Sequence, residues 1–210
     1  YGENADTAFC HLFADGEISL ENGMKFTCET KYPYDFDILY RIERGGRLAV
    51  RIPGWSRTWQ LTLNEKTPDA ADITLKKGYL YLTVSDGDTV KLSLDKTARF
   101  QYASPKIPEL TGKTAISRGP LVYCFEGVDN QGDVLSLSLQ KEGSLEVSAF
   151  QENLLGGTVT ITVDAFRTDA IDELYTDKAP GAKPCKAVAV PYYTWGNRGE
   201  NQMRVWMNAT

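Results

Sequence analysis

Residue types that commonly carry out catalysis are sparse in this 210-residue sequence. A serine nucleophile needs an activating base, and the single histidine, His11, lies in an apolar run that we expect to be a strand. Paired carboxylates can hydrolyse glycosides, but the two Asp-x-Asp pairs, which begin at Asp35 and Asp86, are commonplace in exposed turns. Glu126 ends an apolar run and is the acid best placed for partial burial. We therefore expect no catalytic set within this chain.

The cysteines do not form a recognisable metal or redox motif. Cys10, Cys28, Cys124 and Cys185 are far apart in sequence, so there is no C-x-x-C pair. Cys10 and Cys28 could approach across a hairpin, but His11 points to the opposite face of the strand from Cys10. The oxygen-rich segment 129–133 lacks the ligand spacing of an EF-hand loop, which favours a solvated turn over calcium. We expect buried free thiols, with a disulfide as the alternative, and no cofactor in this chain.

Aromatic side chains could provide a platform on which a sugar stacks, because their rings present flat apolar faces. Trp55, Trp59, Tyr79 and Tyr81 lie near one another in sequence and are the candidate carbohydrate contacts. Most such residues in a β-sandwich belong to the core. Packing is therefore the main interpretation, and a binding platform is the alternative.

Two arginines occupy loops in which a charge has a specific place. Arg118 precedes a Gly-Pro pair, and Arg198 follows the Trp195-Gly196-Asn197 segment. A guanidinium group can bind several carbonyls or a carboxylate from one planar fork. We expect Arg118 and Arg198, together with Glu126 and Trp195, to hold loops together, with a role at an interface as the second interpretation.

The elements that must position these residues read almost entirely as strands. Runs with period-two alternation recur at short spacing, with turn residues such as Asn22-Gly23 between them. The pattern stops in a loop with two prolines, at 104–108, and then restarts. It predicts an all-β chain of two consecutive antiparallel β-sandwich (jelly-roll-like) domains, at residues 1–103 and 104–210. The least regular stretch, 166–187, contains one expected helical turn at 171–175.

Composition excludes several classes of function. The net charge is −5 and there is no cationic stripe, so we expect no nucleic-acid partner. No apolar run is long enough to cross a membrane as a helix, so we expect no membrane partner. The first ten residues show no signal-peptide pattern.

Six motifs in order resemble the C-terminal part of the β-L-arabinofuranosidase-type glycoside hydrolases, family 127. The two most specific are ISRGPLVYCFE at 116–126 and PYYTWGNRG at 191–199. The others are TKYPY at 30–34, RIPGW at 51–55, GYLYL at 78–82 and GDTV at 87–90. Together they span nearly the whole chain.

The resemblance implies a non-catalytic role beside a catalytic domain. In such enzymes an N-terminal (α/α)-barrel carries adjacent cysteines, a zinc ion and the glutamate acid/base, and β-sandwich domains follow it. This sequence has no adjacent cysteines, so no catalytic or zinc residue is carried over, and zinc is expected only in the parent's catalytic domain. The implied partners are that barrel, arabinose-containing glycans through the parent, and a second copy in a homodimer. A carbohydrate-binding module is the alternative function, and the resemblance leaves a cytoplasmic or a periplasmic bacterial location open.

Overall fold

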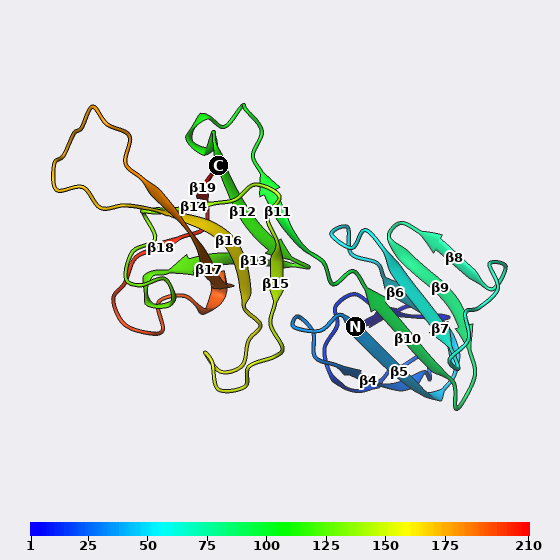
Figure 1. Cartoon of the computed structure of the whole chain (residues 1–210). Coiled ribbons are helices and arrows are strands. Elements are labelled where there is room, and N and C mark those ends of the chain that lie inside the picture. Colours follow the sequence, from blue (N-terminus) through cyan, green and yellow to red (C-terminus); the bar gives the residue numbers. More distant parts are fainter. The chain divides into compact units, whose positions relative to one another are not determined.

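A computed structural model describes residues 1–210 as two compact units, Tyr1–Lys96 and Thr97–Thr210 (Figure 1). Both units are built from strands, so the prediction of an all-β, sandwich-type chain is confirmed. The helices are three short 3-10 segments: η1 (Pro108–Leu110), η2 (Gly127–Asp129) and η3 (Tyr192–Thr194). None of the helices has the length and apolarity needed to cross a membrane.

The first unit consists of two five-stranded sheets. The strand order of the first sheet is β1-β2-β6-β9-β8, and that of the second is β3-β4-β5-β10-β7. All pairs are antiparallel except β2 and β6, which run parallel. The strands of the first sheet are β1 (Gly2–Glu3), β2 (Thr7–Cys10), β6 (Gly46–Arg51), β9 (Tyr79–Val84) and β8 (Ile73–Lys76). Those of the second are β3 (Gly16–Ser19), β4 (Lys25–Thr30), β5 (Asp37–Arg44), β10 (Thr89–Leu94) and β7 (Trp59–Leu63).

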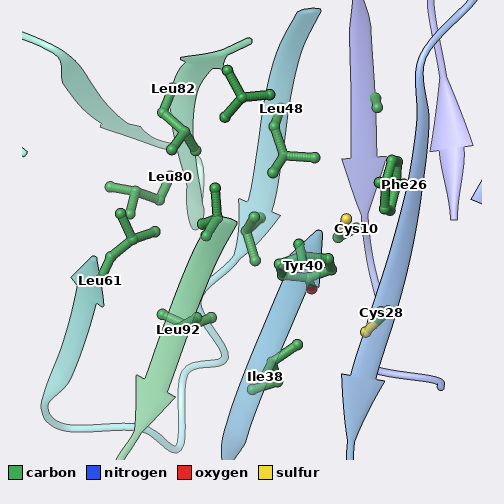
Figure 2. Close-up of a cluster of buried hydrophobic side chains, with 14 of the residues drawn as sticks. Cys10, Phe26, Cys28, Ile38, Tyr40, Leu48, Leu61, Leu80, Leu82 and Leu92 are labelled. Atoms are coloured by element: carbon green, nitrogen blue, oxygen red, sulfur yellow. The ribbon is translucent and has the colours of Figure 1, made fainter. Parts of the chain in front are cut away.

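Alternation along each strand decides which side chains enter the core of this unit. On β9 the even-numbered residues Leu80, Leu82 and Val84 are buried, whereas Tyr79 and Tyr81 point to the other face. Phe26 and Tyr40, from β4 and β5, are among the largest fully buried side chains (Figure 2). Complete burial of each such apolar side chain stabilises the fold by about 1.5–3 kcal/mol.

Two connections carry the chain from one sheet of the first unit to the other at the same end. Gly45 joins β5 to β6, and its N–H donates to Asp86 Oδ1 at 2.7 Å. Asp86 lies in the turn between β9 and β10, which also belong to different sheets. A Cβ atom on Gly45 would lie 2.3 Å from the Val84 carbonyl oxygen, so only glycine fits. The Gly45-Gly46 and Asp86-Gly87-Asp88 segments therefore bind each other where the chain changes sheets.

The second unit has nine strands whose pairings close on themselves. The circuit β12–β19–β14–β16–β17–β13 returns to β12, and β11, β15 and β18 pair at its sides. Closure leaves few free edges. The strands are β11 (Ala98–Tyr102), β12 (Lys113–Arg118), β13 (Leu121–Glu126), β14 (Leu137–Leu139), β15 (Leu145–Val147), β16 (Ile161–Thr168), β17 (Ala182–Pro191), β18 (Met203–Arg204) and β19 (Met207–Ala209).

The structure places the division between the units earlier in the chain than the expected boundary at 103/104. Strand β11 pairs with β12 along its whole length, from Ala98 opposite Arg118 to Tyr102 opposite Thr114. Residues 98–102 thus belong to the second unit. The proline-containing loop that suggested a domain boundary is a connection between two paired strands.

The helical turn expected at 171–175 is wrong. This segment is an irregular part of the long connection between β16 and β17, and Leu174 and Tyr175 are more than nine-tenths exposed. The five residues have no apolar surface to pack against, and a helix of that length is not stable alone.

Candidate functional site

A buried carboxylate and two loops meet at the end of strand β13 in the second unit. Glu126, the last residue of β13, is fully buried. Its Oε2 accepts a hydrogen bond from Arg198 Nη2, and its Oε1 accepts one from the Gly196 N–H at 3.1 Å. Arg198 also forms a two-pronged contact with Asp129, in which Nη1 donates to Oδ1 at 2.7 Å and Nη2 donates to Oδ2. We call Glu126, Asp129 and Arg198 the loop network.

The charges of the loop network are matched to one another. Burial acts to raise the pKa of Glu126, but Arg198, the Gly196 N–H and Asn201 outweigh it and hold that pKa below its ordinary value. Hydrogen bonds to Asp129 and Glu126 raise the pKa of Arg198 despite partial burial. Glu126 is therefore ionised and bound in place, which is not the state of a carboxyl that donates or takes up a proton near neutral pH.

The neighbouring turn, residues 129–133, is solvated at Gln131 and Gly132, as the sequence favoured, but Asn130 is buried within it. Asn130 is 3% exposed, and its Nδ2 donates to the carbonyl oxygens of Glu126 at 2.7 Å and Val188 at 2.9 Å. The Val188 N–H donates to Asn130 Oδ1 at 3.0 Å. Arg167 donates to the carbonyl oxygens of Asn130 and Asp133 at 2.9 Å each. These groups bind protein partners, and no calcium-like ligand set is formed.

The other structural candidates of the second unit lie apart from the buried carboxylate. Arg118 ends β12 and is 7% exposed. Trp195 stacks on Tyr192, with ring centroids 6.4 Å apart, and is 43% exposed. The structure thus brings Glu126 and Arg198 together, and places Trp195 on the same loop as Arg198 with its ring toward solvent.

The two Asp-x-Asp pairs of the first unit are bound by structural partners. Lys96 Nζ lies 2.7 Å from Asp35 Oδ1 and 3.1 Å from Asp37 Oδ1. Burial raises the pKa of both aspartates, but the lysine and other donors outweigh it and lower them overall. In the second pair, Asp88 Oδ2 accepts a hydrogen bond from the Ser85 N–H at 2.7 Å, and Asp86 binds Gly45. Neither pair is arranged as an acid and a base.

The four aromatic residues singled out in the sequence separate into two groups. Trp55 and Trp59 pack against the core of the first unit, and the Trp55 ring lies 5.2 Å from that of Phe36. Tyr79 and Tyr81 project from the opposite face of strand β9. Position in sequence suggested one platform, but alternation and the change of sheet put the tryptophans and tyrosines in different surroundings.

Tyr79 and Tyr81 join an aromatic cluster on the outer face of the first sheet. Phe9 lies edge to face with both tyrosines, at 5.9 Å and 6.2 Å between ring centroids. His11 stacks on Phe9 at 5.8 Å, and its Nδ1 is 2.7 Å from the Tyr79 hydroxyl oxygen. Beneath them Ala49 is fully covered. We call Phe9, His11, Tyr79 and Tyr81 the outer aromatic face.

The thiols are not arranged for chemistry. All four cysteines are free, and Cys10, Cys28 and Cys124 are buried, in line with the expected free thiols. Burial raises the pKa of Cys10 and of Cys124 to about 12, so neither is a thiolate at neutral pH. His11 and Cys10 lie on opposite sides of the strand, and the chain holds no group of three or more metal-ligating side chains.

Sequence reasoning missed Phe9, Asn130 and Arg167 as members of these clusters. Phe9 shares its face with Tyr81 because both pair with Ala49, one from each side. That register is not visible in sequence, since β2 and β6 are a parallel pair separated by three other strands, β3, β4 and β5. For Asn130, the signal was its position four residues after Glu126, directly beyond the motif at 116–126.

Comparison with known proteins assigns both units. The family description "Beta-L-arabinofuranosidase, GH127 middle domain" matches residues 7–96, and "Glycoside hydrolase family 127 C-terminal domain" matches residues 98–208. A non-reducing end β-L-arabinofuranosidase of Bifidobacterium longum subsp. longum is 34% identical to 97% of this chain. The chain spans 33% of that relative's length.

Solved structures give the same result. A family 127 β-L-arabinofuranosidase from Geobacillus stearothermophilus T6 is 36% identical, with a TM-score of 0.89 over 100% of this chain and 35% of its own. A second family 127 β-arabinofuranosidase is 27% identical, with a TM-score of 0.86 over 98% of this chain and 35% of its own. With the two descriptions covering residues 7–96 and 98–208, this chain belongs to glycoside hydrolase family 127 and carries that family's middle and C-terminal domains.

Proposed function

We propose that these two domains are a non-catalytic part of a family 127 glycoside hydrolase, and that they support the catalytic domain and help to shape the rim of its cleft. The proposal rests on one observation: the reactive groups within the chain are already bound by structural partners or are protonated. Glu126 and Asp129 are bound by Arg198, Asp35 and Asp37 by Lys96, and the buried thiols are protonated. A chain of this kind has no free acid/base pair with which to cleave a glycosidic bond.

The substrate of the complete enzyme is proposed from its relatives. The Bifidobacterium and Geobacillus relatives are named as β-L-arabinofuranosidases. We expect the parent of this chain to act on β-L-arabinofuranosides, with zinc and the catalytic residues held by the domain that precedes residue 7. The side chains present here do not fit a zinc site, because no three metal-ligating groups converge.

Two further features of the proposal concern binding and assembly. A sugar platform made of Trp55, Trp59, Tyr79 and Tyr81 is not favoured, because the tryptophans pack against the core. Formation of a homodimer stays a prediction, which light scattering of the purified chain would test.

An activity assay tests the lack of catalysis. We expect the chain alone to release no nitrophenol from 4-nitrophenyl β-L-arabinofuranoside above the buffer rate, with or without added zinc. The intact Geobacillus enzyme is the positive control. Turnover by this chain that persists through purification and is lost in Glu126→Gln would show that the proposal is wrong.

A hybrid protein tests the supporting role. The part of the Geobacillus enzyme that precedes its own middle domain is expressed alone, and also joined upstream of this chain. We expect the hybrid to have a higher thermal unfolding midpoint and more activity than the part expressed alone. Equal stability and equal activity in the two proteins would contradict a supporting role.

A further inference from the structure

The outer aromatic face is unusual in its position. One face of an antiparallel sandwich sheet packs on the core, and the other is ordinarily polar. Here Phe9, Ala49 and Tyr81 form a row across three neighbouring strands on the face turned away from the core. Ala49 is fully buried although it lies on this outward face, because the aromatic rings cover it. Phe9, Tyr79 and Tyr81 are each partly exposed, so they leave apolar ring surface on this face that a partner could cover.

Ring geometry distinguishes between two kinds of occupant. A sugar stacks on a ring whose flat face is open. The Phe9 ring makes angles of 86° with Tyr79 and 90° with Tyr81, and lies stacked against His11 at 11°. The guanidinium carbon of Arg47 lies over the Tyr81 ring, 5.2 Å from its centroid. Ring faces are thus largely taken by neighbours, which suits a packed protein interface and not a sugar platform.

The first strands of the chain run along this same face. Strand β1 forms the edge of the sheet, and Gly2 pairs with Phe9. A Cβ atom on Gly2 would lie 2.7 Å from His11 Nε2, so the backbone at Gly2 passes close against that ring. Residues 7–96 of this chain match the middle domain of the family, so in family members polypeptide precedes this unit. Polypeptide that precedes β1 therefore joins the sheet at the edge beside His11, although the Tyr1 side chain itself packs on the core residue Phe26.

The charges around the patch specify the chemistry of the occupant. Arg47, Lys76 and Lys77 line a cavity of about 370 Å³ beside Phe9 and Tyr81, with Asp6 as the acid among the lining residues. This basic margin occurs in a chain whose net charge is −5. Complementary surfaces place carboxylates opposite such a margin.

We propose that the outer aromatic face is the docking surface for the domain that precedes residue 7 in family 127 enzymes, and that this domain presents apolar side chains rimmed by carboxylates. The inference rests on the proposed supporting function and adds to it the face through which support is given. About two thirds of the length of the relatives lies outside the matched segment, which supplies a partner large enough to cover the patch.

Hydroxyl-radical footprinting of the hybrid described above tests the inference. We expect the oxidation rates of Tyr79 and Tyr81 to fall about threefold or more relative to the free chain, because the centre of an interface excludes water. Tyr102 and Tyr175, in the second unit and 55% and 91% exposed, serve as internal controls. Unchanged rates at Tyr79 and Tyr81 in a stabilised hybrid would overturn the inference and leave the supporting function intact. A hybrid that gains no stability would instead count against the supporting function.

A charge-reversal variant tests the role of the basic margin. We expect Lys76→Glu/Lys77→Glu to remove most of the stabilisation of the hybrid while leaving the unfolding of the free chain unchanged, because both side chains are exposed in the free chain. The matched control is Lys106→Glu/Lys178→Glu, which makes the same change in net charge at exposed positions of the second unit. Equal effects of the two variants would contradict a docking surface with a basic margin.

The intact Geobacillus enzyme provides a measurement that does not depend on folding of the hybrid. Side chains at its positions aligned with Phe9 and Tyr81 should be protected from oxidation. Footprinting of the free chain with added arabinan tests whether a sugar is instead the occupant of this face. Protection of Tyr79 and Tyr81 by arabinan, without protection by the preceding domain, would make the face a sugar site and the inference wrong.

Discussion

The loop network of the second unit and the outer aromatic face of the first unit differ in how fully their own unit encloses them: the first is matched internally, and the second is proposed to receive a partner. Glu126, Asp129 and Arg198 have the residue types of an active site, yet their charges are matched within the unit. Phe9 and Tyr81 have the residue types of a core, yet they project away from it. Residue type alone therefore misleads in both places. What separates structure from function is whether the side chain's partners are supplied by its own unit.

The largest effect is expected on breaking the loop network. Arg198→Ala leaves Glu126 buried without its charge partner, and loss of one member of a buried ion pair costs about 3–5 kcal/mol. We expect the free energy of unfolding of the second unit to fall by about that amount, while the first unit is unaffected. Hydrogen exchange measured by mass spectrometry at rising urea concentration reports each unit separately.

A conservative variant sharpens this result. Arg198→Lys keeps the charge but cannot bind Glu126 and Asp129 with one planar fork, so we expect only partial recovery. Lys183→Ala, which removes an exposed ion pair with Asp169, is the control and should change stability by less than about 1 kcal/mol. A loss in Arg198→Ala no larger than in Lys183→Ala would mean that the network does not hold the loops.

Asn130, the buried residue of the turn at 129–133, should be the next most sensitive position. Asn130→Ala removes the hydrogen bonds that the Asn130 side chain donates to the carbonyl oxygens of Glu126 and Val188 and the one that it accepts from the Val188 N–H. These backbone groups are then left unpaired. Each such group costs about 1–3 kcal/mol. We expect a loss of about 2 kcal/mol in the second unit, measured in the same experiment. Gln131→Ala, in the same turn but exposed, is the matched control, and equal losses in the two variants would contradict the role of Asn130 as a hub.

The pH dependence of the second unit should show the lowered pKa of Glu126. A carboxyl whose pKa is lower in the folded state contributes stability that is fully present above its unfolded pKa, about 4.3. That stability is lost as the pH falls through the folded pKa. We expect Glu126→Gln to be less stable than the native chain at pH 7, and the difference to shrink as the pH falls below about 4. A difference that is constant from pH 7 to pH 3 would mean that Glu126 is not held ionised by Arg198.

Much of the fold could be predicted from sequence because local pattern determines it. The strands Trp59–Leu63, Tyr79–Val84 and Thr89–Leu94 coincide with alternating runs in the sequence, and Leu121–Glu126 coincides with the apolar run that Glu126 ends. Strand β11 was missed because Ala98–Tyr102 has no clear alternation and gains its structure from β12. Pairing between distant strands also explains why the outer aromatic face was not foreseen. Phe9 and Tyr81 are 72 positions apart, and only the sheet brings them to the same side of Ala49.

The roles of the candidate residues were harder to predict than the strands. Arg198 contacts Asp129 and Glu126, and it could be singled out in sequence because a fork with several donors stands in a glycine-rich loop; that it ties the loops together stays a prediction. The grouping of Trp55 and Trp59 with Tyr79 and Tyr81 used distance in sequence. Distance in sequence cannot show that the side chains of Trp55 and Trp59 turn toward the core.

The smallest effect is expected at the outer aromatic face of the free chain, and a pair of neighbours on strand β9 measures it. Leu80 points into the core and Tyr81 away from it. Leu80→Ala should destabilise the first unit by about 2–5 kcal/mol. Tyr81→Ala should cost about 1 kcal/mol, since it removes edge-to-face contacts with Phe9 and the cover of Ala49 but leaves no internal cavity.

The same pair then tests whether the face acts outside its own unit. In the hybrid with the preceding domain, Tyr81→Ala should lose more stability than it does in the free chain, because the ring then contributes to an interface as well as to its own cluster. The loss caused by Leu80→Ala should be the same in both proteins, because its partners all lie within the unit. Identical losses for Tyr81→Ala in the free chain and in the hybrid would reduce the outer aromatic face to a local packing feature, and would remove the difference between the two regions.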